Sequence, residues 1–352
     1  MPRPAGQGVV TATAEPVLAV EDLTVRLPTH DGVVHAVTGL TYQVRPGETL
    51  GIVGESGSGK TVSALAVLGL HDRQARVSGS VRVAGTEVVG APERTLRRLR
   101  GNEVAMVFQD PLSALHPYYP VGRQIAEAHL AHHGVSRAAA RARAVEMLDR
   151  VGIAQADRRA DDFPHQMSGG MRQRAMIAMA LVNDPRLVVA DEPTTALDVT
   201  VQAQILDLLR DLQRETGSAV VLITHDLGVV AETADRMLVM YGGRAVESGR
   251  TRDVLADPKM PYTWGLLSSM PDLDADVHVP LRPIQGTPPS LVDPPGGCPF
   301  HPRCPHVADV PGGRCRTELP LLEARAEGGH LSRCHLGDPD AVRSRSLGRR
   351  DG

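Results

Sequence analysis

Eight consecutive residues have the types and spacing of a loop that binds phosphate. They are Gly54, Glu55, Ser56, Gly57, Ser58, Gly59, Lys60 and Thr61, and Val62 follows them. Glycines allow backbone N–H groups to surround phosphate oxygens, and the Lys60 ammonium suits the β- and γ-phosphates. The hydroxyl of Thr61 is suited to bind Mg²⁺. The segment therefore predicts a site for a nucleoside triphosphate and Mg²⁺.

A pair of carboxylates follows a second apolar run, residues 187–190. Asp191 comes first and fits the role of a second Mg²⁺ ligand, reached directly or through water. Glu192 follows it, and we expect its carboxylate to act as the general base that deprotonates the attacking water. Taken alone, two acids after a strand would indicate a solvated strand end. Together with a phosphate-binding loop they indicate hydrolysis.

Short β-rich runs alternate with helical patterns, which predicts an α/β fold. The phosphate loop lies between a strand over residues 50–53 and a helix over residues 61–70, as its mechanism requires. A helical insert is expected over about residues 96–182, with Ser136 as an N-cap. Strands are predicted over 17–27, 41–44, 81–83, 104–108, 187–190, 219–224 and 237–240, and helices over 121–132, 137–151, 171–181 and 200–215.

The composition changes along the chain and predicts two folded units. A nucleotide-binding domain is expected over residues 17–250, and a looser, proline-rich extension over 251–340. Residues 1–16 and 341–352 are expected to be disordered tails. The net charge of −3 argues against binding to nucleic acid, and no apolar stretch is long enough to cross a membrane.

Several segments resemble the motifs of ABC-type ATPases. The run FPHQMSGGMRQR at residues 163–174 is similar to the family's signature motif, and it contains Ser168, Gly169 and Gly170. The resemblance implies that these three residues contact the ATP held by the opposite subunit of a head-to-tail dimer. It also implies that Gln109 approaches Mg²⁺ and water, that His225 reaches the γ-phosphate, and that Asp198, in the segment 196–198, links the two nucleotide sites.

Nearly the whole chain resembles the ATPase subunits of dipeptide and oligopeptide importers. The matching runs are FQDPLSALHP at 108–117, ADEPTTALDVT at 190–200, PYTWGLL at 261–267 and GCPFHPRCP at 297–305. The resemblance implies a chain bound peripherally at the cytoplasmic face of the cell membrane. Its expected partners are a second ATPase subunit, with a heterodimer favoured, two membrane permeases, and indirectly an extracytoplasmic peptide-binding protein. Residues 111–122 would receive a permease helix.

Other functions compete with peptide import. Nickel importers share much of the same pattern, so the transported solute is less defined than the class of transporter. A soluble ABC ATPase acting on DNA or ribosomes is a rival, although the sequence has neither a long coiled-coil insert nor a second ATPase core. A protein that binds ATP without hydrolysing it would be expected to have degraded motifs, and these are intact.

One part of the nucleotide site departs from the family pattern. The family usually stacks adenine on an aromatic side chain about 25 residues before the lysine of the phosphate loop. Residues 31–37 contain no Phe, Tyr or Trp, and we expect Val34 or His35 to cover the base instead. Because a stacked aromatic ring contributes about 1 kcal/mol, weaker discrimination between bases follows.

All 4 cysteines lie in the last fifth of the chain, at Cys298, Cys304, Cys315 and Cys334. Clustering in a reducing compartment indicates metal binding rather than disulfides. There is no Cys-x-x-Cys pair, so the residues alone leave an iron–sulfur cluster, zinc with mixed ligands and free thiols open. Nearby histidines that could share in ligation are His301, His306, His330 and His335. The family resemblance implies a [4Fe-4S] cluster, which would stabilise a poorly cored segment.

Overall fold

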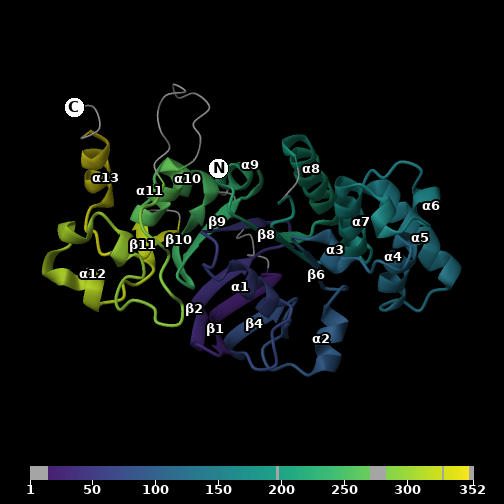
Figure 1. Cartoon of the computed structure of the whole chain (residues 1–352), viewed down its shortest axis with the longest axis horizontal. Helices are drawn as coiled ribbons and strands as arrows, with labels where there is room; N and C mark the ends of the chain where they lie inside the picture. The colour runs from purple at the N-terminus through teal and green to yellow at the C-terminus, as the bar shows by residue number, and fades with distance from the viewer. Residues whose placement is uncertain (1–14, 196–197, 270–282, 327–328, 349–352) are drawn as a thin grey trace, which may run out of the picture.

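The computed structural model describes residues 15–195, 198–269, 283–326 and 329–348 and contains two sheets. Figure 1 shows the sheets near the centre, with helices to either side. The larger sheet has the strand order β11-β12-β10-β9-β3-β8-β7-β6. Its strands are β3 (Thr49–Val53), β6 (Val104–Val107), β7 (Leu187–Asp191), β8 (Ala219–Thr224), β9 (Arg236–Tyr241), β10 (Arg244–Arg250), β11 (Glu323–Ala326) and β12 (His330–Ser332). Strands from β9 to β6 are parallel, whereas β10, β12 and β11 continue the sheet antiparallel.

The centre of this sheet explains where the functional residues meet. Every residue of β3, β7 and β8 is buried, as expected for parallel strands covered on both faces. Parallel strands end at one edge of a sheet, so the loops after β3, β7 and β8 lie together. The predicted strands over residues 50–53, 187–190, 219–224 and 237–240 are confirmed.

The second sheet is antiparallel and packs beside helix α1 (Lys60–Val67). It has the order β2-β1-β4-β5, made of β1 (Leu18–Thr29), β2 (Gly32–Val44), β4 (Arg76–Val83) and β5 (Thr86–Glu87). The strand predicted over 41–44 is therefore much longer than expected. Its first half, from Gly32, follows a tight hairpin in which Thr29 pairs with Gly32, and long-range pairing overrides its mixed sequence pattern.

Helices dominate the region between β6 and β7, in agreement with the predicted insert. They are α3 (Pro111–Ala114), α4 (Val121–Leu130), α5 (Arg137–Arg150), α6 (Ala156–Arg159), the short η1 (Pro164–Gln166) and α7 (Gly169–Leu181), with α2 (Glu93–Leu99) before β6. Ser136 caps α5 as predicted, because its hydroxyl accepts from the backbone N–H of Ala139 at 3.2 Å. Apolar residues of α4, α5 and α7, such as Ile125, Met147 and Ile177, share one core with the adjacent side of the large sheet.

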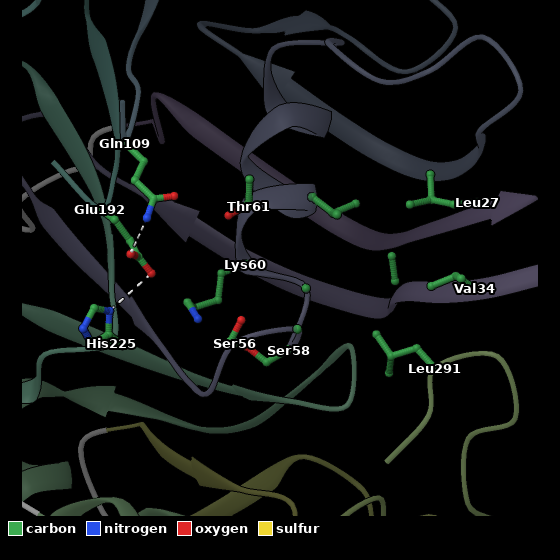
Figure 2. A pocket seen from close by; sticks show the side chains of 14 residues that line it. Leu27, Val34, Ser56, Ser58, Lys60, Thr61, Gln109, Glu192, His225 and Leu291 are labelled. Atoms are coloured by element: carbon green, nitrogen blue, oxygen red, sulfur yellow. Dashed lines mark hydrogen bonds and ion pairs between the residues drawn. The ribbon is translucent and has the colours of Figure 1, made fainter. Parts of the chain in front are cut away.

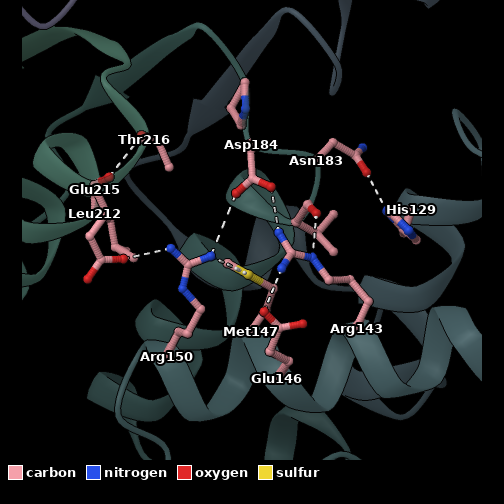
Figure 3. Close-up of polar contacts among 12 residues, drawn as sticks. His129, Arg143, Glu146, Met147, Arg150, Asn183, Asp184, Leu212, Glu215 and Thr216 are labelled. Carbon is pink, nitrogen blue, oxygen red and sulfur yellow. Dashed lines mark hydrogen bonds and ion pairs between the residues drawn. The ribbon is translucent and has the colours of Figure 1, made fainter.

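Two arginines of α5 attach this helical region to the rest of the chain (Figure 3). Arg143 donates to the Val182 carbonyl at 3.1 Å and to the Asp184 carboxylate at 2.7 Å. Arg150 donates to Glu215 at 2.7 Å, and Glu215 belongs to α8 (Val199–Thr216). These bonds supplement the apolar contacts that fix α5 and α7 relative to the sheet.

The C-terminal extension is better ordered than its sequence predicted. It contains α10 (Thr251–Ala256), α11 (Pro261–Ser268), η2 (His301–Arg303), η3 (Val307–Asp309), η4 (Pro311–Gly313), α12 (Arg314–Thr317) and α13 (Pro339–Gly348), after α9 (Leu227–Thr233) of the preceding region. Its strand β12 pairs with β10 and enlarges the central sheet. Tyr241, Tyr262 and Phe300 form an aromatic cluster with ring centroids 4.5 to 5.3 Å apart. The expectation of a poorly cored segment is wrong.

The predicted tails have different outcomes. The expectation of disorder over residues 341–352 is wrong where α13 extends to Gly348, and Lys259 forms an ion pair at 2.6 Å with Asp340 of this helix. Residues 349–352 and 1–14 lie outside the described residues.

Candidate functional site

A pocket of about 670 Å³ lies at the carboxyl ends of the central strands (Figure 2). We call its side with Ser56, Lys60, Thr61, Gln109, Glu192 and His225 the polar end, and its side with Leu27, Val34, Ala36 and Leu291 the apolar end. Gly57, Ser58, Gly59 and Val62 also line it. The predicted phosphate loop therefore does border a cavity large enough for a nucleotide.

The phosphate loop has the backbone that its glycines were expected to provide. Gly59 precedes α1 with φ of 100°, and a Cβ at this position would lie 2.2 Å from the Ala36 carbonyl oxygen. Only glycine fits there without displacing β2. The turn brings the Lys60 ammonium back to the carbonyl oxygens of Gly54 and Glu55, at 2.7 and 3.0 Å. Burial lowers the pKa of Lys60, while nearby carboxylates oppose that effect.

A hydroxyl and a carboxylate meet beside the loop, where Mg²⁺ was predicted. Thr61 donates from Oγ1 to Oδ1 of Asp191 at 3.3 Å. Asp191 ends β7 and is buried, and burial raises the pKa of its carboxyl. Oxygen ligands from a threonine and an aspartate are those that Mg²⁺ prefers, so these residues fit the ion.

Glu192 is held by groups from three other positions. Its carboxylate accepts from Nε2 of Gln109 at 3.1 Å and from Oγ1 of Thr195 at 2.9 Å, and it lies 3.3 Å from Nδ1 of His225. Its backbone has φ of 47°, an uncommon value for a residue with a side chain, and its N–H donates to the Ile223 carbonyl at 2.8 Å. Gln109, Glu192 and His225, far apart in sequence, thus meet at the polar end.

Six predicted nucleotide-contacting residues do not line this pocket: Gly54 and Glu55 at the start of the phosphate loop, and four residues elsewhere. Ser168 caps α7 by accepting from the N–H of Met171 at 3.3 Å, and Gly169 and Gly170 begin that helix. Asp198 caps α8, where it accepts from the N–H of Val201 at 3.0 Å. Ser168, Gly169 and Asp198 are exposed, so they are free to contact a second chain. Residues 196–197 of the predicted segment 196–198 lie outside the described residues.

The apolar end is built from two segments that are distant in sequence, the β1–β2 hairpin and the C-terminal extension. Val34 of β2 lines it, as one of the two alternatives predicted, together with Leu27 of β1 and Leu291 of the C-terminal extension. His35, the other alternative, contributes its backbone N–H to the Leu291 carbonyl at 2.7 Å and does not line the pocket. Leu27 and Leu291 could not be predicted, because a leucine in a strand or loop has no pattern that distinguishes a ligand contact.

The four cysteines converge in the extension without forming a metal site. Cys298, Cys304, Cys315 and Cys334 belong to or border one apolar core, and burial raises the pKa of all four thiols, to about 12 for Cys298 and Cys304. Across the described residues, no three His, Cys, Asp or Glu side chains are arranged to hold a metal ion. The thiols therefore do not fit a cluster as placed here, and the prediction of an iron–sulfur centre is not supported.

In the part of the chain that the structure describes, helices long and apolar enough to span a bilayer are absent.

Two family profiles match the chain. Residues 37–195 match the ABC transporter family, and residues 246–310 match the C-terminal region of oligopeptide/dipeptide transporters. Among solved structures, the ATP-binding cassette MJ0796, in a post-hydrolysis dimer bound to ADP and Pi, is similar with a TM-score of 0.60 and 27% identity. The similarity covers 67% of this chain and 99% of that cassette, which confirms the predicted α/β ATPase core.

Curated relatives extend the similarity beyond the core. OppD of Mycobacterium tuberculosis, an oligopeptide transport ATP-binding protein, is 56% identical over 308 residues, covering 87% of this chain. The chain spans about half the length of this relative (50%). OppD of Salmonella typhimurium is 50% identical over 316 residues, which cover 88% of this chain and 93% of the relative. The chain therefore belongs to the family of oligopeptide transport ATP-binding proteins, within the ABC transporters.

Proposed function

We propose that this chain hydrolyses ATP to power the uptake of dipeptides or oligopeptides through a pair of membrane permeases. The observation that carries the proposal is the gathering of Gln109, Glu192 and His225 beside a phosphate loop that contains Lys60. These residues come from separate segments, and their meeting supplies a base, a cation and orienting donors in one cavity. The names of the similar proteins support peptides as the solute.

In the proposed reaction, water attacks the γ-phosphorus of ATP and the bond to the bridging β–γ oxygen breaks, which gives ADP and phosphate. Glu192 accepts the proton of the attacking water, and Gln109 orients its carboxylate through the bond of 3.1 Å. Lys60 exchanges its two carbonyl acceptors for phosphate oxygens, which accept stronger hydrogen bonds because they are charged. Thr61 and Asp191 would hold Mg²⁺, which neutralises charge on the β- and γ-phosphates.

A second ATPase subunit would complete the site. The exposed N-terminus of α7, with Ser168 and Gly169, presents a hydroxyl and free backbone N–H groups, which suit a phosphate held by another chain. We propose a head-to-tail heterodimer in which this helix end and Asp198 contact the nucleotide site of the partner. Closure on ATP and reopening after hydrolysis would then drive the permeases.

The segment of residues 111–122 is proposed as the surface on which a permease docks. Leu112 and Tyr118 are 55% and 80% exposed, which is much exposed apolar side chain for one short segment. The segment begins two residues after Gln109, so movement of the docked helix would reach the polar end. Tyr119 differs, because its ring packs on Arg123 at 4.5 Å and on His116 at 4.7 Å, which gives it a local structural role.

Tyr118→Ala tests this surface. We expect peptide uptake by cells to fall about tenfold or more, because truncating a central interface aromatic costs roughly 2 kcal/mol. Basal ATP hydrolysis by the purified chain should stay within about twofold, since Tyr118 lies outside the nucleotide pocket. Val135→Ala is the control, an exposed apolar residue of the same helical region. Equal loss of uptake and hydrolysis would contradict a docking role.

Isolation of the chain from its native membranes tests the partners and the location. A chain bound peripherally at the cytoplasmic face should remain with membranes in mild detergent and copurify with two permeases and a second ATPase. An extracytoplasmic binding protein of the same system would define the solute, and a nickel-binding one would replace the peptide assignment. Recovery from the soluble fraction alone would support the soluble ABC ATPase instead.

A [4Fe-4S] cluster bound by the four cysteines would be independent of ATP hydrolysis. The observation in its favour is that Cys298, Cys315 and Cys334 belong to one apolar core, against which Cys304 packs. Iron and acid-labile sulfide are to be measured in anaerobically purified chain. Both in roughly fourfold molar excess over protein would establish a [4Fe-4S] centre, and their absence would leave buried free thiols.

A further inference from the structure

One side chain of the C-terminal extension forms an ion pair with a residue of the phosphate loop. Arg303, at the end of η2, has a side chain only 4% exposed. Its guanidinium donates to both carboxylate oxygens of Glu55, from Nη1 at 2.6 Å and from Nη2 at 3.1 Å. Glu55 is the second residue of the loop, and Lys60 bonds to its carbonyl oxygen. A bidentate pair of this kind fixes direction as well as distance.

The backbone of Glu55 is held by the extension too. Its N–H donates to the hydroxyl of Tyr262 at 2.9 Å, and Tyr262 of α11 is fully buried. The Tyr262 ring packs on Tyr241, whose hydroxyl accepts from Nη1 of Arg303 at 3.3 Å. Both the main chain and the side chain of Glu55 therefore depend on residues more than 200 positions later in the sequence.

The same arginine also holds the segment that reaches the apolar end of the pocket. Arg303 donates from Nε to the Gln285 carbonyl at 2.9 Å and from Nη2 to the Ile284 carbonyl at 3.2 Å. A few residues on, Leu291 lines the apolar end and accepts from the N–H of His35. One guanidinium thus links the phosphate loop to the segment that supplies a wall at the opposite end of the pocket.

We propose that the C-terminal extension completes the nucleotide site of its own chain. Arg303 is a positioning residue that sets the phosphate loop and the Leu291 segment relative to each other, and Leu291 is a wall against which the nucleotide base packs. This inference rests on the proposed nucleotide function of the pocket. It makes the extension part of the ATP site, in addition to any contact that it makes with other subunits.

The two residues should be distinguishable by the ligand whose binding they change. In the full-length chain, Arg303→Gln should weaken inorganic tripolyphosphate by about tenfold, since the phosphate loop loses its anchor, and ATP by at least as much, since the Leu291 segment is released too. Leu291→Ala should weaken ATP by about threefold and leave tripolyphosphate unchanged, because only the base compartment loses contact. The constants are to be measured by titration calorimetry with Mg²⁺ present. Arg303→Lys should recover part of the loss, since one charged hydrogen bond remains.

The control is Arg314→Gln, which removes an exposed ion pair with Glu318 at 2.9 Å elsewhere in the extension. It should bind both ligands as the unmodified chain does. Steady-state hydrolysis gives an independent reading, because Arg303→Gln should raise KM with little change in kcat if it acts by positioning.

A second variant is needed because Arg303→Gln could weaken binding simply by misfolding. Glu55→Gln removes the other half of the ion pair, and the double variant should bind ATP no more weakly than the worse single variant. Additive losses, or tripolyphosphate binding unchanged in Arg303→Gln, would overturn the positioning role. Equal weakening of ATP and tripolyphosphate in Leu291→Ala would overturn the base wall. Failure of the unmodified chain to bind ATP would instead refute the proposed function.

Discussion

The two ends of the nucleotide pocket are assembled in different ways. At the polar end, Lys60 and Thr61 come from one short loop, and Glu192 follows a strand end next to Asp191, which accepts from Thr61. At the apolar end, Leu27, Val34 and Leu291 come from a hairpin and from a segment some 260 residues later. Charge and hydrogen bonding require particular residue types at fixed spacing, whereas an apolar wall requires only shape. The polar end is therefore visible in sequence and the apolar end is not.

The largest expected effect is at the polar end. Glu192→Gln keeps the size of the side chain and its contact with Gln109 but removes the base. The kcat for ATP hydrolysis should therefore fall about 10²-fold. Binding of ATP should persist, because Lys60 and Thr61 are untouched. Single-turnover hydrolysis and ATP titration measure the two separately.

The control for this variant is Glu215→Gln, which alters an exposed carboxylate that pairs with Arg150 far along α8. It should hydrolyse ATP at the rate of the unmodified chain. Unaltered hydrolysis in Glu192→Gln would show that another group accepts the proton. The polar end would then bind nucleotide without Glu192 acting as the base.

The next effect concerns the backbone on which the polar end is built. Gly59→Ala would place a Cβ 2.2 Å from the Ala36 carbonyl at φ of 100°, and we expect it to lower the free energy of unfolding by roughly 3 kcal/mol. Gly217→Ala is the matched control, since Gly217 has φ of 66° and an added Cβ there meets nothing within 4 Å. It should cost about 1 kcal/mol, the cost of the backbone conformation alone.

Urea unfolding without nucleotide measures both glycine variants, so that ligand contacts do not contribute. Equal losses in the two would mean that β2 yields to the new Cβ. In that case the close approach of the loop to β2 would not be what requires glycine at position 59.

Local signals explain why so much of the core was predictable. The buried parallel strands β3, β7 and β8 are continuous apolar runs, and Ser136 is a polar residue directly before a helical pattern. Such signals lie within a few residues of the structure that they specify. The same holds for the phosphate loop, whose glycines and lysine are adjacent.

The extension was mispredicted because its order comes from distant contacts. Strand β12, which includes His330, has no strand pattern, but His330 lies 2.7 Å from the fully buried Glu247 of β10. Glu247 also accepts from the N–H of Met260 at 3.3 Å. A buried carboxylate with partners supplied from two other segments cannot be inferred from composition, and dense proline does not by itself make a segment loose. Arg303 lies between Cys298 and Cys304, and nothing in that run of residues indicates its bond to Glu55.

The smallest expected effect is at the apolar end, where shape replaces chemistry. Aliphatic walls give no hydrogen bond to a base edge, so ATP and GTP should bind this chain with affinities within about threefold of each other. Val34→Tyr places an aromatic ring where the pocket has none and should tighten ATP binding about fivefold, since a stacked ring contributes about 1 kcal/mol. Val33→Tyr is the control, because Val33 is the neighbouring exposed residue on β2 and does not line the pocket. Competition titrations measure the affinities of ATP and GTP for the unmodified chain and of ATP for the two variants. A strong preference for ATP in the unmodified chain, or no gain in Val34→Tyr, would contradict this account. The base would then be recognised by groups other than these aliphatic side chains.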